Sequence, residues 1–269
     1  MIHSARAMLS FVSLCSLGAC VVGADRVDPG PNRSLTGEID SAVVDPIEFE
    51  PDSVFTLESG TTNYVVVPSA YDASHETPMT LFVWLHGCGG SSEDDIWTAA
   101  PGGQNWISLA VGGAEYDCWD MDTGPDMVLA AIDELETHFN VARDRVILGG
   151  YSSGGDLSYR TAFFNAERFA GVLSANSSPF RDSGVSADEA LGAAAWPFNV
   201  VQLAHLQDDT YPIDGVREET AQMEASGHPV TLIEVDGTHW DDEGDGVPGT
   251  SADIATYLFP YLNAGWTAP

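Results

Sequence analysis

The stretch Arg145–Gly155, RVILGGYSSGG, decides the fold of this chain, because it has the pattern of a buried strand that runs into a sharp turn. Residues 146–148 (VIL) form the short, apolar, partly β-branched run expected of a strand covered on both faces. In residues 150–154 the pattern G-x-S-x-G then places Ser152 at the apex of a turn, with small residues where strand and helix approach closely. Helix formers and apolar residues at helical spacing predict a helix over residues 156–169.

A glycine-rich turn between a strand and a helix can also serve packing alone, so Ser152 by itself defines no function. A phosphate-binding loop does not fit this stretch, because no lysine follows the glycines and it contains neither G-x-x-x-x-G-K-[ST] nor G-x-G-x-x-G. A nucleophilic serine would need a histidine and a carboxylate elsewhere in the chain.

The composition indicates one α/β domain of ordinary size with an N-terminal appendage, since the chain has 269 residues. It carries 41 acidic residues against nine basic ones, all arginine, for a formal charge of -32. Such a surface argues against binding to nucleic acid, and against binding to an anionic membrane through a basic face.

The first 19 residues have the features of an export signal, with Arg6 followed by a short apolar run over residues 8–19. This run is too short to stay in a membrane as a spanning helix. Residues 17–20, LGAC, resemble the lipobox of bacterial lipoproteins, which implies cleavage before Cys20 and a lipid on its sulfur. Ordinary signal cleavage and a buried N-terminal segment are the alternatives. We therefore expect an extracytoplasmic protein, anchored to the bacterial envelope through lipid alone or secreted.

Residues 20–50 follow as the lipidated N-terminus and a flexible tether, rich in aspartate and containing Pro-Gly-Pro at 29–31. Residues 51–269 form the predicted folded domain, and no later apolar run is long enough to span a bilayer. Once Cys15 and Cys20 are assigned to the signal and the lipid, only two cysteines remain. A disulfide between Cys88 and Cys118 would add roughly 3 kcal/mol of stability; isolated buried thiols are the alternative.

The first half of the domain is expected to hold two strands, two helices and a short third strand. The predicted strands are residues 63–68, 79–86 and 114–119, and the predicted helices are residues 105–111 and 125–140. The strand ending at residue 86 is apolar throughout and should be central, so functional groups are expected at its carboxyl end.

That end carries the glycine-rich segment His86–Gly90, which resembles the oxyanion loop of lipases and esterases. In such loops a backbone N–H stabilises the charge that develops on a carbonyl oxygen. The resemblance implies that the donors are the amides of Cys88 and Ser153. We interpret His86 as a structural residue that holds the loop, not as a catalytic base.

The second half alternates strands and helices, as expected of a mostly parallel sheet. Strands are predicted at residues 170–175, 198–206 and 229–235, and helices at residues 216–226 and 252–262. The segment 176–196 is too short for a large cap domain, which favours a site open to a bulky or polymeric substrate.

Two adjacent aspartates follow the strand that ends near residue 206, where a hydrolase of this kind presents its acid. Asp208 is preferred, because in hydrolases that this segment resembles the acid stands four residues before a proline, here Pro212. Asp209 stays open as the alternative acid, and a pair of turn-forming aspartates is common enough to prove little alone.

His239 lies in a loop just past the last strand and completes the chain order serine, aspartate, histidine. His205 falls inside a predicted strand and His228 precedes one, so both are interpreted as structural. The acidic run 241–246 lacks the closing glutamate of an EF-hand loop and is interpreted as a solvated loop, so no metal site is expected.

Together, LHGCGG at 85–90, GYSSGG at 150–155, the aspartate pair and GTHW at 237–240 resemble the esterase, feruloyl esterase and polyhydroxybutyrate depolymerase group of α/β-hydrolases. The resemblance covers residues 64–262. It implies an α/β-hydrolase fold, with a mostly parallel central sheet, helices on both faces and no large cap domain.

The resemblance also implies an exported enzyme that hydrolyses carboxylic esters, of feruloyl or acetyl-polysaccharide or polyhydroxyalkanoate type, through an acyl-enzyme. Ser152, His239 and Asp208 would form the triad, and no metal or organic cofactor would be needed. A serine peptidase on the same fold and a non-catalytic surface lipoprotein that binds a carbohydrate or a partner are the alternatives.

Overall fold

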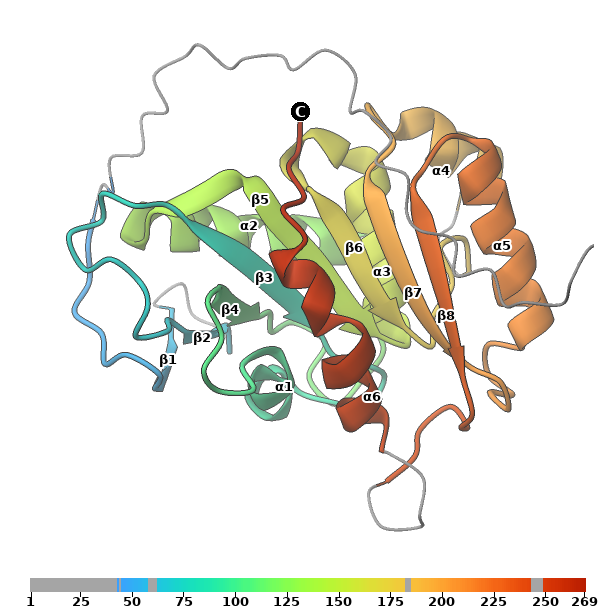
Figure 1. The fold of residues 1–269 in the computed structure, drawn as a ribbon, viewed down its shortest axis with the longest axis horizontal. Coiled ribbons are helices and arrows are strands. Elements are labelled where there is room, and N and C mark those ends of the chain that lie inside the picture. The colour runs from blue at the N-terminus through green and yellow to red at the C-terminus, as the bar shows by residue number, and fades with distance from the viewer. Residues whose placement is uncertain (1–42, 44, 58–61, 182–184, 243–248) are drawn as a thin grey trace, which may run out of the picture. The chain divides into compact units, whose positions relative to one another are not determined.

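A computed structural model of the chain describes residue 43 and residues 45–57, 62–181, 185–242 and 249–269. Their core is an eight-stranded sheet with the order β1-β2-β4-β3-β5-β6-β7-β8 (Figure 1). The strands are β1 (Val54–Thr56), β2 (Tyr64–Val66), β3 (Met79–Leu85), β4 (Ile107–Ala110), β5 (Val141–Tyr151), β6 (Gly171–Ala175), β7 (Asn199–His205) and β8 (Val230–Val235). The β1–β2 and β2–β4 pairs are antiparallel, and every pair from β4 to β8 is parallel.

Helices cover both faces of this sheet. They are α1 (Ser92–Ala99), α2 (Gly124–His138), α3 (Ser153–Phe164), α4 (Ala187–Ala193), α5 (Ile213–Ala225) and α6 (Thr250–Tyr257). Apolar side chains of α1 and α6 pack into one core cluster, and those of α2, α3, α4 and α5 pack into another. Figure 1 shows α1 and α6 in front of the sheet and α2 and α3 behind it.

The strands supply both cores by alternation. Along β3, Phe82 and Trp84 enter the core under α1 and α6, whereas Leu81, Val83 and Leu85 enter the opposite core. All five side chains are buried, which explains why the sequence of this strand is apolar without a break. The predicted α/β architecture is therefore confirmed, and among the described residues between β6 and β7 the helical structure is limited to α4.

The predicted signal peptide, Cys20 and the greater part of the predicted tether lie outside the described residues. So does most of the acidic run at 241–246. Within the part of the chain that the structure describes, no helix is long and apolar enough to cross a membrane.

Two predictions for the segment before α2 were wrong. Residues 105–111 do not form a helix, because residues 107–110 are the strand β4, with all four buried. Ile107 and Leu109 face one core and Ala110 the other, and a short run buried on both faces cannot be told from a buried helix by periodicity. Residues 114–119 are a loop instead of a strand, and Tyr116 takes a positive φ of 63° there.

Helix boundaries also differ from the prediction. The last helix was expected over 252–262, but α6 ends at Tyr257 and a 3-10 turn covers Phe259–Asn263. Pro260 lies in this stretch, and proline has no N–H to donate within an α-helix. The strand β1 and the helices α1 and α4 had no counterpart in the prediction.

We expect the burial of His228 to make the stability of the fold depend on pH. Its ring is buried against the rings of Phe198 and Phe163, at centroid distances of 4.8 and 6.0 Å, and burial lowers its pKa to about 4. Between the ordinary pKa of 6.5 and pH 4 the unfolded chain therefore binds the additional proton. The stability that comes from keeping this ring neutral is complete above pH 6.5 and falls as the pH drops toward 4.

Between pH 7 and pH 4.5 the free energy of unfolding should fall in both the wild type and His228→Leu. We expect the fall to be smaller in His228→Leu than in the wild type, by about 2–3 kcal/mol. Urea unfolding of both proteins at the two pH values measures the difference, and carboxylates that titrate in the same range contribute equally to both. Equal pH dependence in the two proteins would contradict this role of His228.

Candidate active site

Ser152 lies at the junction of β5 and α3, where the backbone turns sharply. Its φ of 53° and ψ of -124° are strained for a residue with a side chain. The glycines of the motif are required by space: a Cβ on Gly150 would collide with the carbonyl carbon of Gly154. A Cβ on Gly154 would collide with the carbonyl oxygen of Leu85. The strand and the helix therefore close on each other and present the Ser152 hydroxyl at the edge of the sheet.

Two further side chains meet Ser152 at this edge. His239 follows β8 and brings its Nε2 to 3.1 Å from the Ser152 Oγ. Asp208 follows β7, and its Oδ2 lies 2.9 Å from Nδ1 of His239. Hydroxyl, imidazole and carboxylate thus stand in one line, although they are far apart in sequence. Each comes just after a parallel strand, and the carboxyl ends of parallel strands meet at one edge.

The structure distinguishes between the two adjacent aspartates. The Asp208 side chain is only 1 % exposed, and its Oδ1 accepts hydrogen bonds from the backbone N–H groups of Thr210 (2.8 Å) and Tyr211 (2.9 Å). These donors hold the carboxylate in the turn while its other oxygen faces His239. Asp209 is exposed, and it is Asp208 that contacts the imidazole.

The ring of His239 is packed between two tyrosines. The Tyr151 ring lies at a centroid distance of 5.2 Å and the Tyr211 ring at 5.5 Å. The Tyr151 hydroxyl also donates to the backbone carbonyl of His239 (2.7 Å), as does Nδ2 of Asn176 (2.8 Å). The histidine is therefore fixed both at its ring and at its backbone.

Polar side chains, both buried and partly exposed, support the loop that carries His239. His205 lies within β7, as predicted, with its Nδ1 2.7 Å from the carbonyl oxygen of Thr238 and its Nε2 3.3 Å from Oδ2 of Asp253. Asp241 accepts from the backbone N–H and the hydroxyl of Thr238, and these hydrogen bonds lower the pKa of the Asp241 carboxyl. His205 thus acts on the loop and does not reach Ser152 through any hydrogen bond in the described residues.

The glycine-rich loop after β3 lies directly against Ser152. A Cβ placed on Gly87 would be 3.3 Å from the Ser152 Cβ, which brings the following residue, Cys88, to the edge of the same site. Ser153 is the first residue of α3, so its backbone N–H has no acceptor within the helix. The Ser153 amide therefore lies beside the hydroxyl without an acceptor in its own helix.

His86, at the start of this loop, is buried and does not contact His239. Its Nδ1 lies 2.8 Å from the carbonyl oxygen of Gly87, and its ring packs on Trp119 at a centroid distance of 4.9 Å. Among the described residues its Nε2 has no hydrogen-bond partner. These contacts are those of a structural residue that holds the glycine-rich loop in its conformation.

A disulfide between Cys88 and Cys118 ties this loop to residues 114–119. Three hydrogen bonds join the same two loops: Gly89 N–H to Asp117 O (3.3 Å), Tyr116 N–H to Gly90 O (2.7 Å) and Trp119 Nε1 to His86 O (2.9 Å). The backbone around Cys88 is therefore held from one side by covalent and polar contacts.

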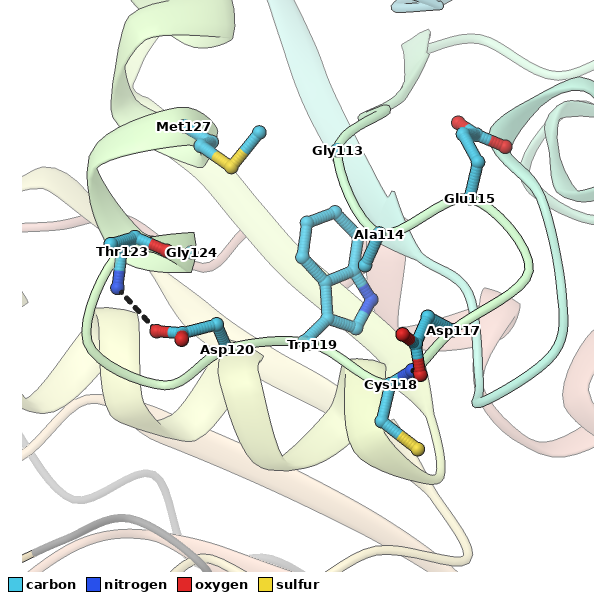
Figure 2. Close-up of a pocket in the computed structure, with 10 residues that line it drawn as sticks. All are labelled: Gly113, Ala114, Glu115, Asp117, Cys118, Trp119, Asp120, Thr123, Gly124 and Met127. Atoms are coloured by element: carbon cyan, nitrogen blue, oxygen red, sulfur yellow. Dashed lines mark hydrogen bonds between the residues drawn. The ribbon is translucent and has the colours of Figure 1, made fainter.

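Beyond the disulfide lies a hollow of about 300 Å³, lined by Gly113, Ala114, Glu115, Asp117, Cys118, Trp119, Asp120, Thr123, Gly124 and Met127. Figure 2 shows the Trp119 indole beside Ala114, and a Cβ on Gly113 would meet the side chains of both Met127 and Trp119. Ser152 and His239 do not line this hollow, so it is separate from the line of three side chains. No group of three or more residues that could hold a metal ion occurs among the described side chains.

Replacing both Cys88 and Cys118 by alanine should lower the free energy of unfolding by about 3–4 kcal/mol, because the disulfide closes a loop of 30 residues. The hydrogen bonds between the two loops remain, so we expect the fold to persist. Urea unfolding of the oxidised wild type and the double variant measures the change. A difference below about 1 kcal/mol would show that the bridge does not restrict the unfolded chain in this way.

Strand order, the serine at the strand–helix turn and the histidine after β8 together define an α/β-hydrolase fold, as the resemblance implied. Solved structures share this fold. Esterase PE8 has 17 % identity and a TM-score of 0.56, with 71 % of this chain and 96 % of that chain covered. A ferulic acid esterase has 14 % identity and a TM-score of 0.55, covering 79 % and 96 %.

The acylaminoacyl peptidase of Pyrococcus horikoshii is also similar, with 14 % identity, a TM-score of 0.58 and 82 % of this chain covered. This chain matches 42 % of that protein's length. The sequence itself matches no protein-family model and no curated protein. At these identities the likeness concerns the fold.

Sequence reasoning missed several residues of the site. Tyr151, Asn176 and Tyr211 contact His239, and Asp156 accepts a hydrogen bond from the Tyr211 hydroxyl. Asn176 directly follows β6 and has a positive φ of 45°, a conformation that asparagine adopts more readily than most residues. For the other residues, a position near a strand end or the serine motif was the available signal.

Proposed function

We propose that this protein is a serine hydrolase that cleaves carboxylic esters through an acyl-enzyme. The observation that carries the proposal is the line from Ser152 Oγ to His239 Nε2 (3.1 Å) and from His239 Nδ1 to Asp208 Oδ2 (2.9 Å). The strained backbone at Ser152 supports it, because strain of this kind is retained where a side chain must be presented for reaction.

In the first step, the Ser152 Oγ attacks the ester carbonyl carbon while Nε2 of His239 takes its proton. Asp208 accepts a hydrogen bond from the Nδ1–H group of His239, which keeps Nε2 free as the base and stabilises the imidazolium that forms. The imidazolium then gives its proton to the departing alkoxide, so the alcohol leaves and the acyl group stays on Ser152. Water, deprotonated by His239, hydrolyses this acyl-enzyme and restores the hydroxyl.

The amides of Cys88 and Ser153 are proposed to bind the oxyanion of the tetrahedral intermediates. The N–H of Ser153 also lies at the positive end of the α3 dipole. The loss of one such donor typically lowers the rate by about 10²- to 10³-fold. The contacts that fix the Cys88 loop thus support catalysis as well as folding.

The substrate is proposed to be an ester of the feruloyl, acetyl-polysaccharide or polyhydroxyalkanoate type. The similar fold of a ferulic acid esterase favours an ester, and the absence of a large insertion in the described residues between β6 and β7 favours an open site for a polymeric chain. We further propose export, with Cys20 as a lipid-bearing N-terminus, because of the apolar run and the LGAC sequence. No metal or organic cofactor enters the proposed chemistry.

A serine peptidase is the second candidate, since the acylaminoacyl peptidase of Pyrococcus horikoshii shares the fold. The same three side chains can attack an amide, whose leaving group must be protonated by His239. The choice between the two depends on which leaving group the site accepts.

Steady-state hydrolysis of p-nitrophenyl acetate and of a peptide p-nitroanilide separates these functions. We expect saturable turnover of the ester and much slower turnover of the anilide. The reverse preference would favour the peptidase, and no turnover of either would favour a non-catalytic binding protein. A panel of feruloyl, acetyl-xylan and hydroxybutyrate esters then identifies the acyl group.

A further inference from the structure

Tyr211 is in contact with two of the three side chains of the site, Asp208 and His239. Its backbone N–H donates to Oδ1 of Asp208 (2.9 Å), and its ring stacks on His239 with an interplanar angle of 25°. One residue therefore links the acid and the base.

The Tyr211 hydroxyl is held by a buried carboxylate. It donates to Oδ2 of Asp156 at 2.8 Å, and Asp156 lies in the first turn of α3, four residues after Ser152. Oδ1 of Asp156 accepts the backbone N–H of Ser178 (2.8 Å), in the loop after β6. The helix N-terminus favours a negative charge at this position. Asp156 thus ties α3, the loop after β6 and the loop after β7 together at one point.

The phenol remains a hydrogen-bond donor throughout the working range of pH. Burial raises the pKa of Tyr211, and the charge of Asp156 raises it further. The guanidinium of Arg181 lies over the ring of Tyr211, 4.5 Å from its centroid, and also donates to the carbonyl oxygen of Thr210. These contacts restrain the plane of the ring that His239 packs against.

Packing alone would not require this hydroxyl. A phenylalanine at position 211 would keep the ring on His239 and the backbone N–H on Asp208. The hydroxyl adds a charge-assisted hydrogen bond to a carboxylate, which is about twice as strong as a bond between neutral groups. Its effect is to hold the hydroxyl end of the ring against α3.

We propose that Tyr211, anchored by Asp156, is a positioning residue that keeps the His239 ring aligned between Asp208 and Ser152 during acyl transfer. This inference rests on the proposed function. Its physical basis is that proton transfer needs Nε2 on the line to Oγ, and small displacements of a reacting group reduce the rate steeply. The pair acts through His239 and does not itself exchange a proton with the substrate.

Tyr211→Phe tests the proposal, with Asp156→Asn reaching the same hydrogen bond from its other end. Asparagine has a single acceptor oxygen and cannot serve both Ser178 and Tyr211 as the carboxylate does. Tyr159→Phe is the matched control: Tyr159 is a fully buried tyrosine on α3 whose hydroxyl donates to Oε1 of Gln202 (2.9 Å), and none of its hydrogen bonds reaches His239. All variants are titrated with a fluorophosphonate, so that kcat refers to active molecules.

For Tyr211→Phe and Asp156→Asn we expect kcat for p-nitrophenyl acetate to fall about 10- to 100-fold. KM should stay within about twofold of the wild type, since only the transition state is affected. The fraction of molecules that the fluorophosphonate has labelled at the end of the reaction should also stay within about twofold. The double variant should be no slower than the slower single variant, because both changes break one hydrogen bond. Tyr159→Phe should keep its kcat per labelled molecule.

A Tyr211→Phe protein with wild-type kcat would overturn the inference while leaving the proposed function intact, and so would multiplicative effects in the double variant. A loss that appears only as a smaller labelled fraction would also overturn it, because that result indicates a purely structural role. A wild type that fluorophosphonate does not label would overturn the inference and the proposed function together.

Discussion

Ser152→Ala should lower the turnover of p-nitrophenyl acetate by about 10⁵- to 10⁶-fold, the size of effect found when a catalytic serine is removed from a hydrolase triad. The hydroxyl is the only atom in the line that can form the acyl-enzyme, and the alanine side chain leaves His239 without a proton to accept. Alanine also fits the strained backbone at position 152 as well as serine does, so the fold should be retained. The measurement is kcat/KM, with circular dichroism to check folding.

Thr161→Val serves as the matched control for the loss of a hydroxyl. Thr161 is buried on α3, and its Oγ1 has no hydrogen-bond partner among the described residues. Valine has the same shape, so stability should change by less than about 1 kcal/mol and turnover should persist. Substantial hydrolysis by Ser152→Ala would remove Ser152 from the mechanism.

Asp208→Asn should lower kcat by about 10⁴-fold with little loss of folding. The introduced asparagine could still accept the backbone N–H groups of Thr210 and Tyr211, but it would then present an amide N–H to His239. The imidazole would turn to the tautomer whose Nε2 carries the proton, and this tautomer cannot take the proton of Ser152.

Asp209→Asn is the control that the sequence itself provides. It removes the same charge one residue further along, from an exposed side chain, and should leave kcat within about twofold of the wild type. Kinetics of the two variants on one ester settle which aspartate acts. A large loss for Asp209→Asn with a small one for Asp208→Asn would reverse the assignment.

The fold was largely predictable because its signals are local. The apolar run of β3, the strand and glycine turn around Ser152, and the position of His239 just after β8 each show in a short window of sequence. Parallel strands then bring such positions to one edge, whatever their distance along the chain. The same reasoning failed for β4, because four residues buried on both faces carry no periodicity.

The support around His239 could not be predicted, because it depends on contacts between distant segments. Tyr211 and Asp156 are separated by 55 residues, and the hydrogen bond between them depends on how α3 meets the loop after β7. The choice between Asp208 and Asp209 depends on the local turn, which buries one carboxylate and exposes its neighbour. The sequence pattern identifies both aspartates as candidates, but it does not show which of them contacts the histidine.

The most direct test of the account is the site of covalent labelling by a fluorophosphonate. After the wild type is treated and digested, peptide mass spectrometry should find one adduct, on Ser152, and the same treatment of Ser152→Ala should leave no adduct in the folded domain. An unlabelled Ser152 in the folded wild type, or an adduct on another residue that persists in Ser152→Ala, would contradict the claim that Ser152, His239 and Asp208 form a catalytic unit.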